Sequence, residues 1–428
     1  MSKAPVLVLC HGSAGDVHPL LGLARRLADR GHPLLVLCGR LHLGAAQRLG
    51  LDAQAVDTDA LPPQAVHGPG LWPAPLLWRR ALQAARASLP MAQAWLARWP
   101  APGPRPVLVA GTFALAGPLL RELHGLRLLT VHLSPAVVPS DTLAVRLGDL
   151  QMPPWWPQRW RAATIRWTER WLFDPVVAPG VNALRAEHGL PPVRRVLSRW
   201  LHSPDGAVAL FPPAFAPVLP PPGLAVQQLG FPLFDPPRAD ARCLADDPEL
   251  LQFLQNGPPP VVFYPASARR DARVFLGRAL ALVREAGSPV PRAVLISRDR
   301  EGLQALGPLP PGVLQRDFVP FDELLPRSAA LVHLGGIGAA AQALRAGIPQ
   351  LALPLHHDQF DNAQRLQDLG VARWVRNHQS ATVLARALNE LQADPRTAQA
   401  CAEWKARLLQ APDALAQAAD AVQALAGP

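Results

Sequence analysis

One histidine and three closely spaced glycines in the second half of the sequence form a pattern that can bind an anion. His333 ends an apolar run, and Gly335, Gly336 and Gly338 follow it where a helical pattern begins. Glycines let the backbone approach a ligand closely, and the free N–H groups at the start of a helix carry about half a unit of positive charge. His333 could donate one more hydrogen bond to a phosphate oxygen. The pattern therefore predicts a diphosphate site that needs no metal ion.

A carboxylate and two amides follow this turn and are suited to bind a sugar. Asp358 and Gln359 offer an acceptor and a donor for the hydroxyls of a pyranose ring, and Asn362 could add a contact. A glycine turn alone is weak evidence, but its combination with this group favours a nucleotide sugar as the ligand. The leaving group of the predicted reaction is then a nucleoside diphosphate.

The same succession of apolar run, glycine turn and helical pattern occurs near the start of the chain. The run Val6–Cys10 leads into Gly12 and Gly15, after which apolar residues recur at helical spacing. Ligands of parallel sheets bind outside the carboxyl ends of the strands. Two such units predict an α/β protein whose two Rossmann-like domains face one cleft.

By the same rule Thr112, Phe113 and Ser134, which follow two further apolar runs, are candidates for an acceptor pocket.

Apolar runs alternate with helical patterns along most of the 428 residues, which favours parallel βαβ units in more than one domain. The runs that predict strands are Val6–Cys10, Leu34–Cys38, Pro106–Ala110, Leu128–Leu133, Ala207–Phe211, Val261–Tyr264, Ala293–Ser297, Ala330–His333 and Gln350–Leu353. Residues 212–235 are dense in proline, which favours a stiff connection. We expect an N-terminal acceptor-binding domain over 1–211, a linker over 212–235 and a C-terminal nucleotide-sugar-binding domain over 236–428. A return of the last helix to the N-terminal domain is left open.

The composition argues against several other classes of protein. No uninterrupted apolar run reaches the roughly 18 residues of a spanning helix, and the four cysteines are dispersed. The net charge of +10 comes almost wholly from arginine, without a nucleic-acid-binding motif. We expect a cytoplasmic protein that does not bind nucleic acid. Its basic surface suits an anionic donor and contact with the inner face of the membrane, although a GC-rich genome would explain the arginine bias equally well.

One segment combines tryptophan with arginine in an unusual way. Trp155, Trp156, Trp160, Trp167 and Trp171 are interleaved with Arg159, Arg161, Arg166 and Arg170. One interpretation is an apolar lip that admits lipid chains or rests on a membrane interface. The other is a helix that packs on its own domain.

The stretch His333–Gly338, together with Asp358 and Gln359, resembles glycosyltransferase family 1, the inverting enzymes of the GT-B fold. The resemblance implies that the H-x-G-G-x-G stretch holds the diphosphate and that the Asp-Gln pair holds the sugar, with no cofactor and no metal. The family often has Thr or Ser after the last glycine, whereas this chain has Ala339. One phosphate contact is therefore lost, and only the backbone N–H remains.

The turn from Gly12 to Pro19 resembles the G-S-x-G-D-V-x-P turn of bacterial members of this family. This resemblance implies that Asp16 is the base, because a carboxylate can take the proton that an alcohol loses as it attacks the anomeric carbon. His11 and His18 are rival bases, and a helix N-cap role is the structural alternative for Asp16. His11 and Ser13 are also candidates for acceptor contacts.

Several stretches, including Leu201–Pro204, Gly230–Asp235 and His357–Asn362, resemble more narrowly the rhamnosyltransferases of rhamnolipid biosynthesis. The resemblance implies transfer of L-rhamnose from dTDP-L-rhamnose to the lipid hydroxyl of a 3-(3-hydroxyalkanoyloxy)alkanoic acid. A second enzyme that supplies this acceptor is a further expected partner. That subgroup tends to carry T-Q-G-S where this chain has Tyr264–Ser267, so only Ser267 is kept as a phosphate contact. The family holds the nucleobase near the segment that contains Phe318 and Val319 here, although Phe318 is equally compatible with an ordinary core position.

Two alternatives remain beside this interpretation. One is a glycosyltransferase that uses UDP-glucose or another nucleotide sugar on a different lipophilic alcohol. The other is a non-catalytic partner protein of the same fold, which would need neither Asp16 nor His333. Asp57-Thr58-Asp59 matches a metal-binding D-x-D pattern, but nearby prolines favour a solvated turn, and His356-His357 lack a third metal ligand.

Overall fold

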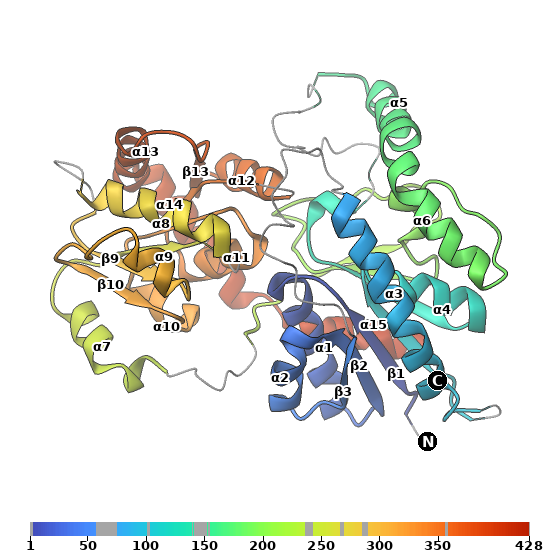
Figure 1. Ribbon diagram of the computed structural model, residues 1–428. Helices are drawn as coiled ribbons and strands as arrows, with labels where there is room; N and C mark the ends of the chain where they lie inside the picture. The colour runs from blue at the N-terminus through green and yellow to red at the C-terminus, as the bar shows by residue number, and fades with distance from the viewer. Residues whose placement is uncertain are drawn as a thin grey trace. The chain divides into compact units, whose positions relative to one another are not determined.

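The computed structural model (Figure 1) describes residues 3–56, 75–100, 103–138, 140, 152, 155–235, 243–265, 269–284, 290–355 and 358–427. The chain divides into two compact units. The first unit comprises Met1–Arg238 together with Pro412–Pro428, and the second unit comprises Ala239–Ala411. Each unit is built around a parallel sheet covered by helices on both faces.

The described residues of the first unit form a seven-stranded parallel sheet of order β3-β2-β1-β4-β5-β6-β7. The strands are β1 (Val6–Cys10), β2 (Leu34–Gly39), β3 (Ala53–Val56), β4 (Val107–Gly111), β5 (Arg127–His132), β6 (Ala207–Ala209) and β7 (Val226–Gln228). The central strand β1 is apolar at every position because both of its faces are buried. Its alternate side chains therefore enter two separate hydrophobic cores.

Helices α1 (Ala14–Asp29), α2 (Arg40–Arg48) and α15 (Ala414–Ala426) cover one face of this sheet, and α3 (Pro75–Leu96), α4 (Ala116–His124) and α6 (Asp174–Glu187) cover the other (Figure 1). The first core contains Val6, Val8 and Cys10, whereas Leu7 and Leu9 belong to the second. Four further segments lie between β5 and β6 in the sequence: η2 (Pro135–Val137), α5 (Gln158–Thr168) and the π-helical turns η3 (Glu169–Phe173) and η4 (Val196–Trp200).

The last helix belongs to the first unit, so it returns from the end of the chain to pack on α1. Leu415 and Val422 are part of the same core as the inner face of α1. Gly22 of α1 allows this close approach, because a Cβ there would lie 2.7 Å from Leu415 Cδ1. The guanidinium of Arg26 also donates to Asp413 at 2.7 Å.

The proline-rich segment 212–235 is part of the first unit and differs from the separate linker that we expected. Its residues Val226–Gln228 form β7, which pairs in parallel with β6. The prolines flank this short strand and none lies within it, so the backbone N–H groups needed for pairing are present. The side chain of Gln228 fixes the preceding turn, since it donates to the Ala216 carbonyl and accepts from the Val218 N–H, both at 2.8 Å.

The described residues of the second unit form a six-stranded parallel sheet of order β10-β9-β8-β11-β12-β13. The strands are β8 (Val261–Tyr264), β9 (Ala293–Ile296), β10 (Val313–Arg316), β11 (Ala330–His333), β12 (Gln350–Ala352) and β13 (Ala372–Trp374). The helices are η5 (Leu244–Asp246), α7 (Pro248–Gln255), α8 (Arg269–Arg284), α9 (Arg300–Gln304), α10 (Phe321–Leu324), η6 (Leu325–Arg327), α11 (Ile337–Ala346), α12 (Gln359–Asp368), α13 (Ala381–Ala393) and α14 (Pro395–Gln410). Two cores flank this sheet, as in the first unit.

Candidate functional site

The glycine turn of the second unit connects the carboxyl end of β11 to the start of α11. Gly335 has a φ of +86°, and a Cβ at this residue would lie 2.8 Å from the carbonyl oxygen of Gln359. Only glycine fits there, because L side chains rarely adopt this backbone conformation and the neighbouring backbone leaves no space. Gly335 is thus required by the fold of the turn itself.

Gly336 and Gly338 differ from Gly335 in their surroundings. A Cβ at either residue would meet no heavy atom within 4 Å. Gly336 is the N-cap of α11, Gly338 lies in its first turn, and this turn contains no acidic residue. The first N–H groups of a helix have no intrahelical acceptor. The head of α11 therefore presents exposed amides beside open space, as an anion site requires.

The side chain of His333 has a different role from the phosphate donor that we expected. It is only 1% exposed, and its Nδ1 accepts a hydrogen bond from the Gly335 N–H at 3.2 Å. The ring proton must therefore reside on Nε2, an atom buried within the described part of the chain. Burial lowers the pKa of His333 to about 4, although the adjacent Gln350 side chain acts to raise it. A neutral His333 therefore stabilises the glycine turn from the protein interior, by accepting the Gly335 N–H.

Asn362 likewise lies in the interior and not on a surface that a sugar could reach directly. It is fully buried, and its Nδ2 donates to the Gly335 carbonyl at 3.1 Å and to Asp358 Oδ2 at 3.0 Å. Asn362 thus joins the glycine turn to the start of α12. The two predicted ligand regions are held together by this one amide.

The other two residues of this group lie at the N-terminus of α12. Asp358 is the N-cap of α12, and Gln359 is its first residue. Gln359 Oε1 accepts from the Leu355 N–H at 2.9 Å, so one end of its amide is fixed by the loop after β12. Both residues are half-buried. They therefore lie on the edge where strands β11 and β12 end, next to the glycine turn.

The residues predicted for the nucleobase follow β10. The side chain of Val319 is 4% exposed and belongs to the core with Leu324 and Leu325, so only its backbone is available to a ligand. Phe318 is half-buried. Ser267 lies outside the described residues, as do Asp57, Asp59, His356 and His357.

In the first unit, the turn between β1 and α1 is closed by its own carboxylate. Ser13 is the N-cap of α1, and both its N–H and its Oγ donate to Asp16 Oδ2 at 2.8 Å. Gly12 has a φ of +126°, and a Cβ there would lie 2.5 Å from the same carboxylate oxygen. The glycine therefore makes room for Asp16 to fold back over the turn. Asp16 acts as a cap, and it is half-buried at the carboxyl end of β1.

Three histidines surround this turn. The hydroxyl of Ser88 donates to the Ala84 carbonyl at 2.7 Å, so His11 Nε2 must be the donor in its 3.2 Å contact with Ser88 Oγ. Burial lowers the pKa of His11 to about 4. His42, which the sequence did not single out, contacts the Gly12 carbonyl through Nε2 at 3.3 Å and meets the ring of His18 edge to face. Burial lowers the pKa of His42, while Gly12 and Asp16 act to raise it.

Thr112 ends a chain of hydrogen bonds through two buried histidines that the sequence also did not reveal. His202 Nε2 contacts the Leu197 carbonyl at 2.6 Å and must carry a proton, so its Nδ1 accepts from His132 Nε2 at 3.3 Å. His132 Nδ1 is then an acceptor, and it lies 2.9 Å from Thr112 Oγ1, whose hydroxyl also contacts the Val131 carbonyl at 3.3 Å. Burial lowers the pKa of His202 to about 4, and burial together with the neighbouring His202 also lowers the pKa of His132. Both rings are neutral, and each tautomer is fixed by its neighbour.

The remaining acceptor candidates lie close to this chain. Ser134 follows β5, is 7% exposed, and its Oγ has no hydrogen-bond partner in the described part of the protein. Phe113 meets the ring of Trp78 edge to face at 6.1 Å. Thr112, Phe113 and Ser134 thus follow neighbouring strands, as predicted, but two of the three are largely buried.

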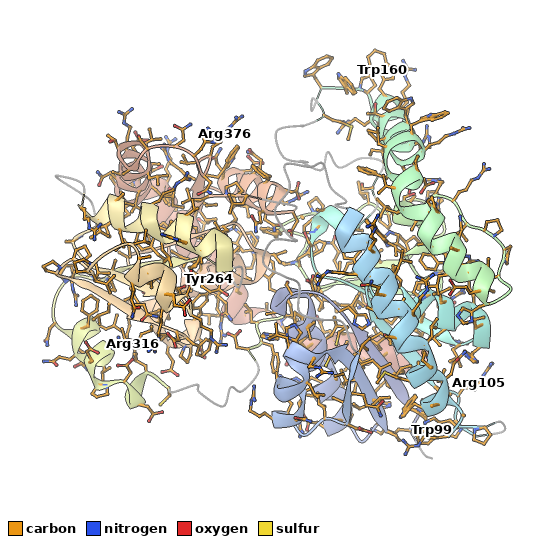
Figure 2. All side chains as sticks on the ribbon, in the orientation of Figure 1. Trp99, Arg105, Trp160, Tyr264, Arg316 and Arg376 are labelled. Atoms are coloured by element: carbon orange, nitrogen blue, oxygen red, sulfur yellow. The ribbon has the colours of Figure 1, made fainter. Side chains whose placement is uncertain are left out.

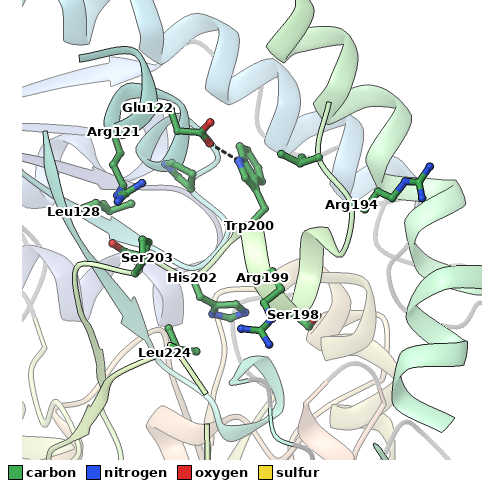
Figure 3. A pocket seen from close by; sticks show the side chains of 14 residues that line it. Arg121, Glu122, Leu128, Arg194, Ser198, Arg199, Trp200, His202, Ser203 and Leu224 are labelled. Atoms are coloured by element: carbon green, nitrogen blue, oxygen red, sulfur yellow. Dashed lines mark hydrogen bonds between the residues drawn. The ribbon is translucent and has the colours of Figure 1, made fainter. Parts of the chain in front are cut away.

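A cavity of about 340 Å³ in the first unit is lined by a different set of residues (Figure 3). Trp200 Nε1 donates to Glu122 at 2.8 Å, Arg121 pairs with Asp205, and Arg194 and Arg199 also line the cavity. Of the hydrogen-bond chain just described, only His202 lines it. None of the residues predicted for the anionic donor lines this cavity. Among the described residues, no group of three or more His, Cys, Asp or Glu side chains is placed to hold a metal ion.

Comparisons with known proteins agree with this architecture. Residues 282–424 match the family described as erythromycin biosynthesis protein CIII-like, C-terminal domain. The O-mycaminosyltylonolide 6-deoxyallosyltransferase of Streptomyces fradiae is 29% identical over 384 residues, covering 86% of this chain and 84% of that protein. The solved structure of the glycotransferase of kitacinnamycin aligns with a TM-score of 0.75 at 20% identity, over 99% of this chain and 100% of that one. The glycosyltransferase VinC in complex with dTDP aligns with a TM-score of 0.68 at 20% identity, over 99% of both chains.

These findings confirm the predicted fold class: the chain has the GT-B fold, with two parallel Rossmann-like sheets. It is a glycosyltransferase, similar over most of its length to the 6-deoxyallosyltransferase of Streptomyces fradiae and over residues 282–424 to the erythromycin biosynthesis protein CIII-like family.

Proposed function

We propose that the second unit binds the diphosphate of a nucleotide sugar at the head of α11 and that the protein transfers the sugar to an acceptor hydroxyl. One observation supports this most strongly: Gly336 and Gly338 leave open space beside exposed helix amides, and nothing in the described protein requires glycine there. Close approach of a ligand to the backbone explains both glycines. The departing diphosphate is stabilised by these amides, so the reaction needs no metal.

The first unit supports this assignment by contrast. At the head of α1 the corresponding place is filled by the carboxylate of Asp16, which accepts from Ser13. A second anion at the head of α1 would be repelled by Asp16. The diphosphate therefore belongs to the second unit, and the first unit supplies a carboxylate.

For the donor, we propose a dTDP-linked deoxysugar. The similar structure of VinC was solved with dTDP, and the relative from Streptomyces fradiae transfers 6-deoxyallose according to its name. Asp358 and Gln359, at the N-terminus of α12, are the proposed contacts of the sugar hydroxyls. Asn362 holds them against the glycine turn, and Phe318 and the backbone of Val319 remain the proposed contacts of the base.

For the acceptor, we propose the hydroxyl of a lipophilic natural product. By its name, the relative from Streptomyces fradiae acts on O-mycaminosyltylonolide, which favours the broader alternative over a rhamnolipid precursor. Thr112, Phe113 and Ser134 are the proposed lining of this acceptor site, together with His11 and Ser13 beside the N-terminal turn.

The proposed chemistry is a single displacement with inversion. Asp16 takes the proton of the acceptor hydroxyl, the hydroxyl oxygen bonds to the anomeric carbon, and the bond from that carbon to the diphosphate breaks. His11 is the rival base. Because its Nε2 is protonated and its pKa lies near 4, the neutral ring would accept a proton only at Nδ1.

The test is turnover of purified protein with a panel of dTDP- and UDP-sugars against lipophilic alcohols, with and without EDTA. We expect a dTDP-deoxysugar to be consumed at a rate that EDTA does not change. Asp16→Asn is expected to abolish transfer and keep dTDP binding, measured by calorimetry, whereas His11→Gln should retain transfer. Full activity of Asp16→Asn would reject the base assignment, and absence of dTDP binding to the wild type would reject the donor assignment.

A further inference from the structure

Three exposed tryptophans form a stripe along one side of α5 and η3. Trp160, Trp167 and Trp171 are spaced by seven and four residues, which brings them to one helical face. They are 52%, 57% and 58% exposed, while Ala162 and Glu169 on the opposite face are buried. Figure 2 shows Trp160 at the end of α5 that lies away from the sheet of its unit. The helix therefore packs on its domain through its other face and presents the tryptophans outward.

A parallel stripe of arginines runs beside the tryptophans. Arg159, Arg166 and Arg170 each precede one of them by one residue, and all three are exposed. None forms an ion pair with a described residue, and the guanidinium of Arg170 lies 5.2 Å from the centre of the Trp171 ring. We call these six residues the Trp–Arg stripe.

The acidic residues of the same segment point inward. Glu169 is buried and accepts from the Ser198 N–H at 2.8 Å, and it also pairs with Arg195. Asp174 accepts from the backbone N–H groups of Arg195 and Val196 at 2.7 and 3.1 Å. Both carboxylates thus serve the fold of the unit. The outward face of α5 and η3 is left aromatic and cationic, without a balancing acid.

We propose that the Trp–Arg stripe docks the protein on the surface of a bilayer that contains anionic lipids. Tryptophan rings are amphipathic and settle at the level of the lipid headgroups, and arginines beside them attract anionic headgroups. Clustered large apolar side chains on a protein surface mark an interaction site. Among the described helices, none combines the length and the apolar character that crossing a bilayer requires. The proposed contact is peripheral, and it is independent of the donor and of the catalytic residues.

The experiment is flotation of the full-length protein with vesicles of phosphatidylglycerol and phosphatidylcholine mixed, and with vesicles of phosphatidylcholine alone. We expect binding to the mixed vesicles only, and weaker binding at high salt because screening shortens the range of the charges. Each arginine near an anionic bilayer surface contributes about fivefold to the binding affinity. A variant that combines Arg159→Gln, Arg166→Gln and Arg170→Gln should therefore bind the vesicles more weakly by on the order of 100-fold. The combined change of Trp160, Trp167 and Trp171 to alanine should abolish binding.

Control variants remove the same charge, or three exposed apolar side chains, at other places on the surface. One control variant changes the exposed Arg98, Arg386 and Arg396 to glutamine, and the other changes the exposed Leu219, Val274 and Leu409 to alanine. Both variants should bind the vesicles like the wild type. Circular dichroism melting should show that every variant folds. The proposal is overturned if the wild type ignores the anionic vesicles or if both stripe variants bind them normally. It is equally overturned if ultracentrifugation shows that the stripe joins two copies of the chain and vesicles are not bound.

Discussion

Gly335 and Gly338 lie in the same turn, yet the structure predicts opposite effects when each is changed to alanine. At Gly335 the left-handed φ costs roughly 1–2 kcal/mol for a residue with a Cβ. The 2.8 Å approach to the Gln359 carbonyl adds overpacking strain of about 1–3 kcal/mol. Gly335→Ala should therefore destabilise the second unit by roughly 2–5 kcal/mol. For a domain of this size, each kcal/mol lowers the melting temperature by about 2–4 °C.

Gly338→Ala should not destabilise the protein. The residue lies in the first turn of α11, a Cβ there meets nothing within 4 Å, and alanine is favoured over glycine in a helix by about 0.5–1 kcal/mol. The new methyl group would, however, occupy the space that we assign to the diphosphate. We expect an unchanged or higher melting temperature and a Kd for dTDP raised at least tenfold, which corresponds to about 1.4 kcal/mol.

Differential scanning calorimetry measures the two stabilities, and titration calorimetry with dTDP measures the affinities. The reasoning about the site is refuted if Gly338→Ala binds dTDP as tightly as the wild type. The reasoning about the turn is refuted if Gly335→Ala melts at the wild-type temperature. Gly307→Ala is a matched control for the left-handed conformation, because it has a φ of +89° with nothing within 4 Å of the added Cβ.

Three further predictions concern the buried polar groups. Asn362→Ala leaves the Gly335 carbonyl and Asp358 without their shared donor and should cost about 1–3 kcal/mol in calorimetric stability; wild-type stability would show that Asn362 does not join the turn to α12. Burial keeps His333 neutral with a pKa of about 4, so its contribution to stability is complete above the unfolded pKa near 6.5 and is lost as pH falls from there towards 4, by on the order of 3 kcal/mol. His333→Gln should flatten that pH dependence in acid unfolding curves, and an unchanged slope would contradict it. His202→Phe leaves His132 Nε2 without an acceptor and should lower stability by about 1–3 kcal/mol, with a changed tautomer of His132 in nitrogen NMR spectra; an unaltered His132 spectrum would disprove the chain of hydrogen bonds.

The sequence predicted the interior strands of both sheets and none of the strands at their edges. All nine predicted runs correspond to strands that lie between two neighbours, and the described strands without a prediction are those at the sheet edges, β3, β7, β10 and β13. The reason is physical. Interior strands of a parallel sheet are buried on both faces and need continuous apolar residues. Edge strands such as Val226–Gln228 are half-exposed, and their composition does not distinguish them from a loop.

The candidate site divides along similar lines. Gly335, Gly336, Gly338, Asp358 and Gln359 form a local pattern, and the structure brings them to one edge of one sheet. His132 and His202 are separated by 70 residues, and no spacing rule connects them. The inward position of Asn362 was also not predictable, because its partner Gly335 is 27 residues away. Contacts of this kind arise only when strands and loops are assembled.

The two glycine turns also predict how a single residue decides which helix binds the diphosphate. Ser13 is the N-cap of α1 and Asp16 is its third residue, and Gly336 and Ala339 hold the same two positions in α11. Ala339→Asp would therefore place a carboxylate at the head of α11, as Asp16 is placed on α1. A negative charge there stabilises the helix by about 0.3–1 kcal/mol. The same carboxylate would repel a phosphate charge about 4 Å away with an energy of about 4 kcal/mol. We expect a folded protein with dTDP affinity reduced at least 100-fold, whereas Ala339→Ser should bind dTDP more tightly because its hydroxyl adds a donor. If Ala339→Asp binds dTDP normally, the diphosphate does not bind at this helix, and the contrast between the two turns has another cause.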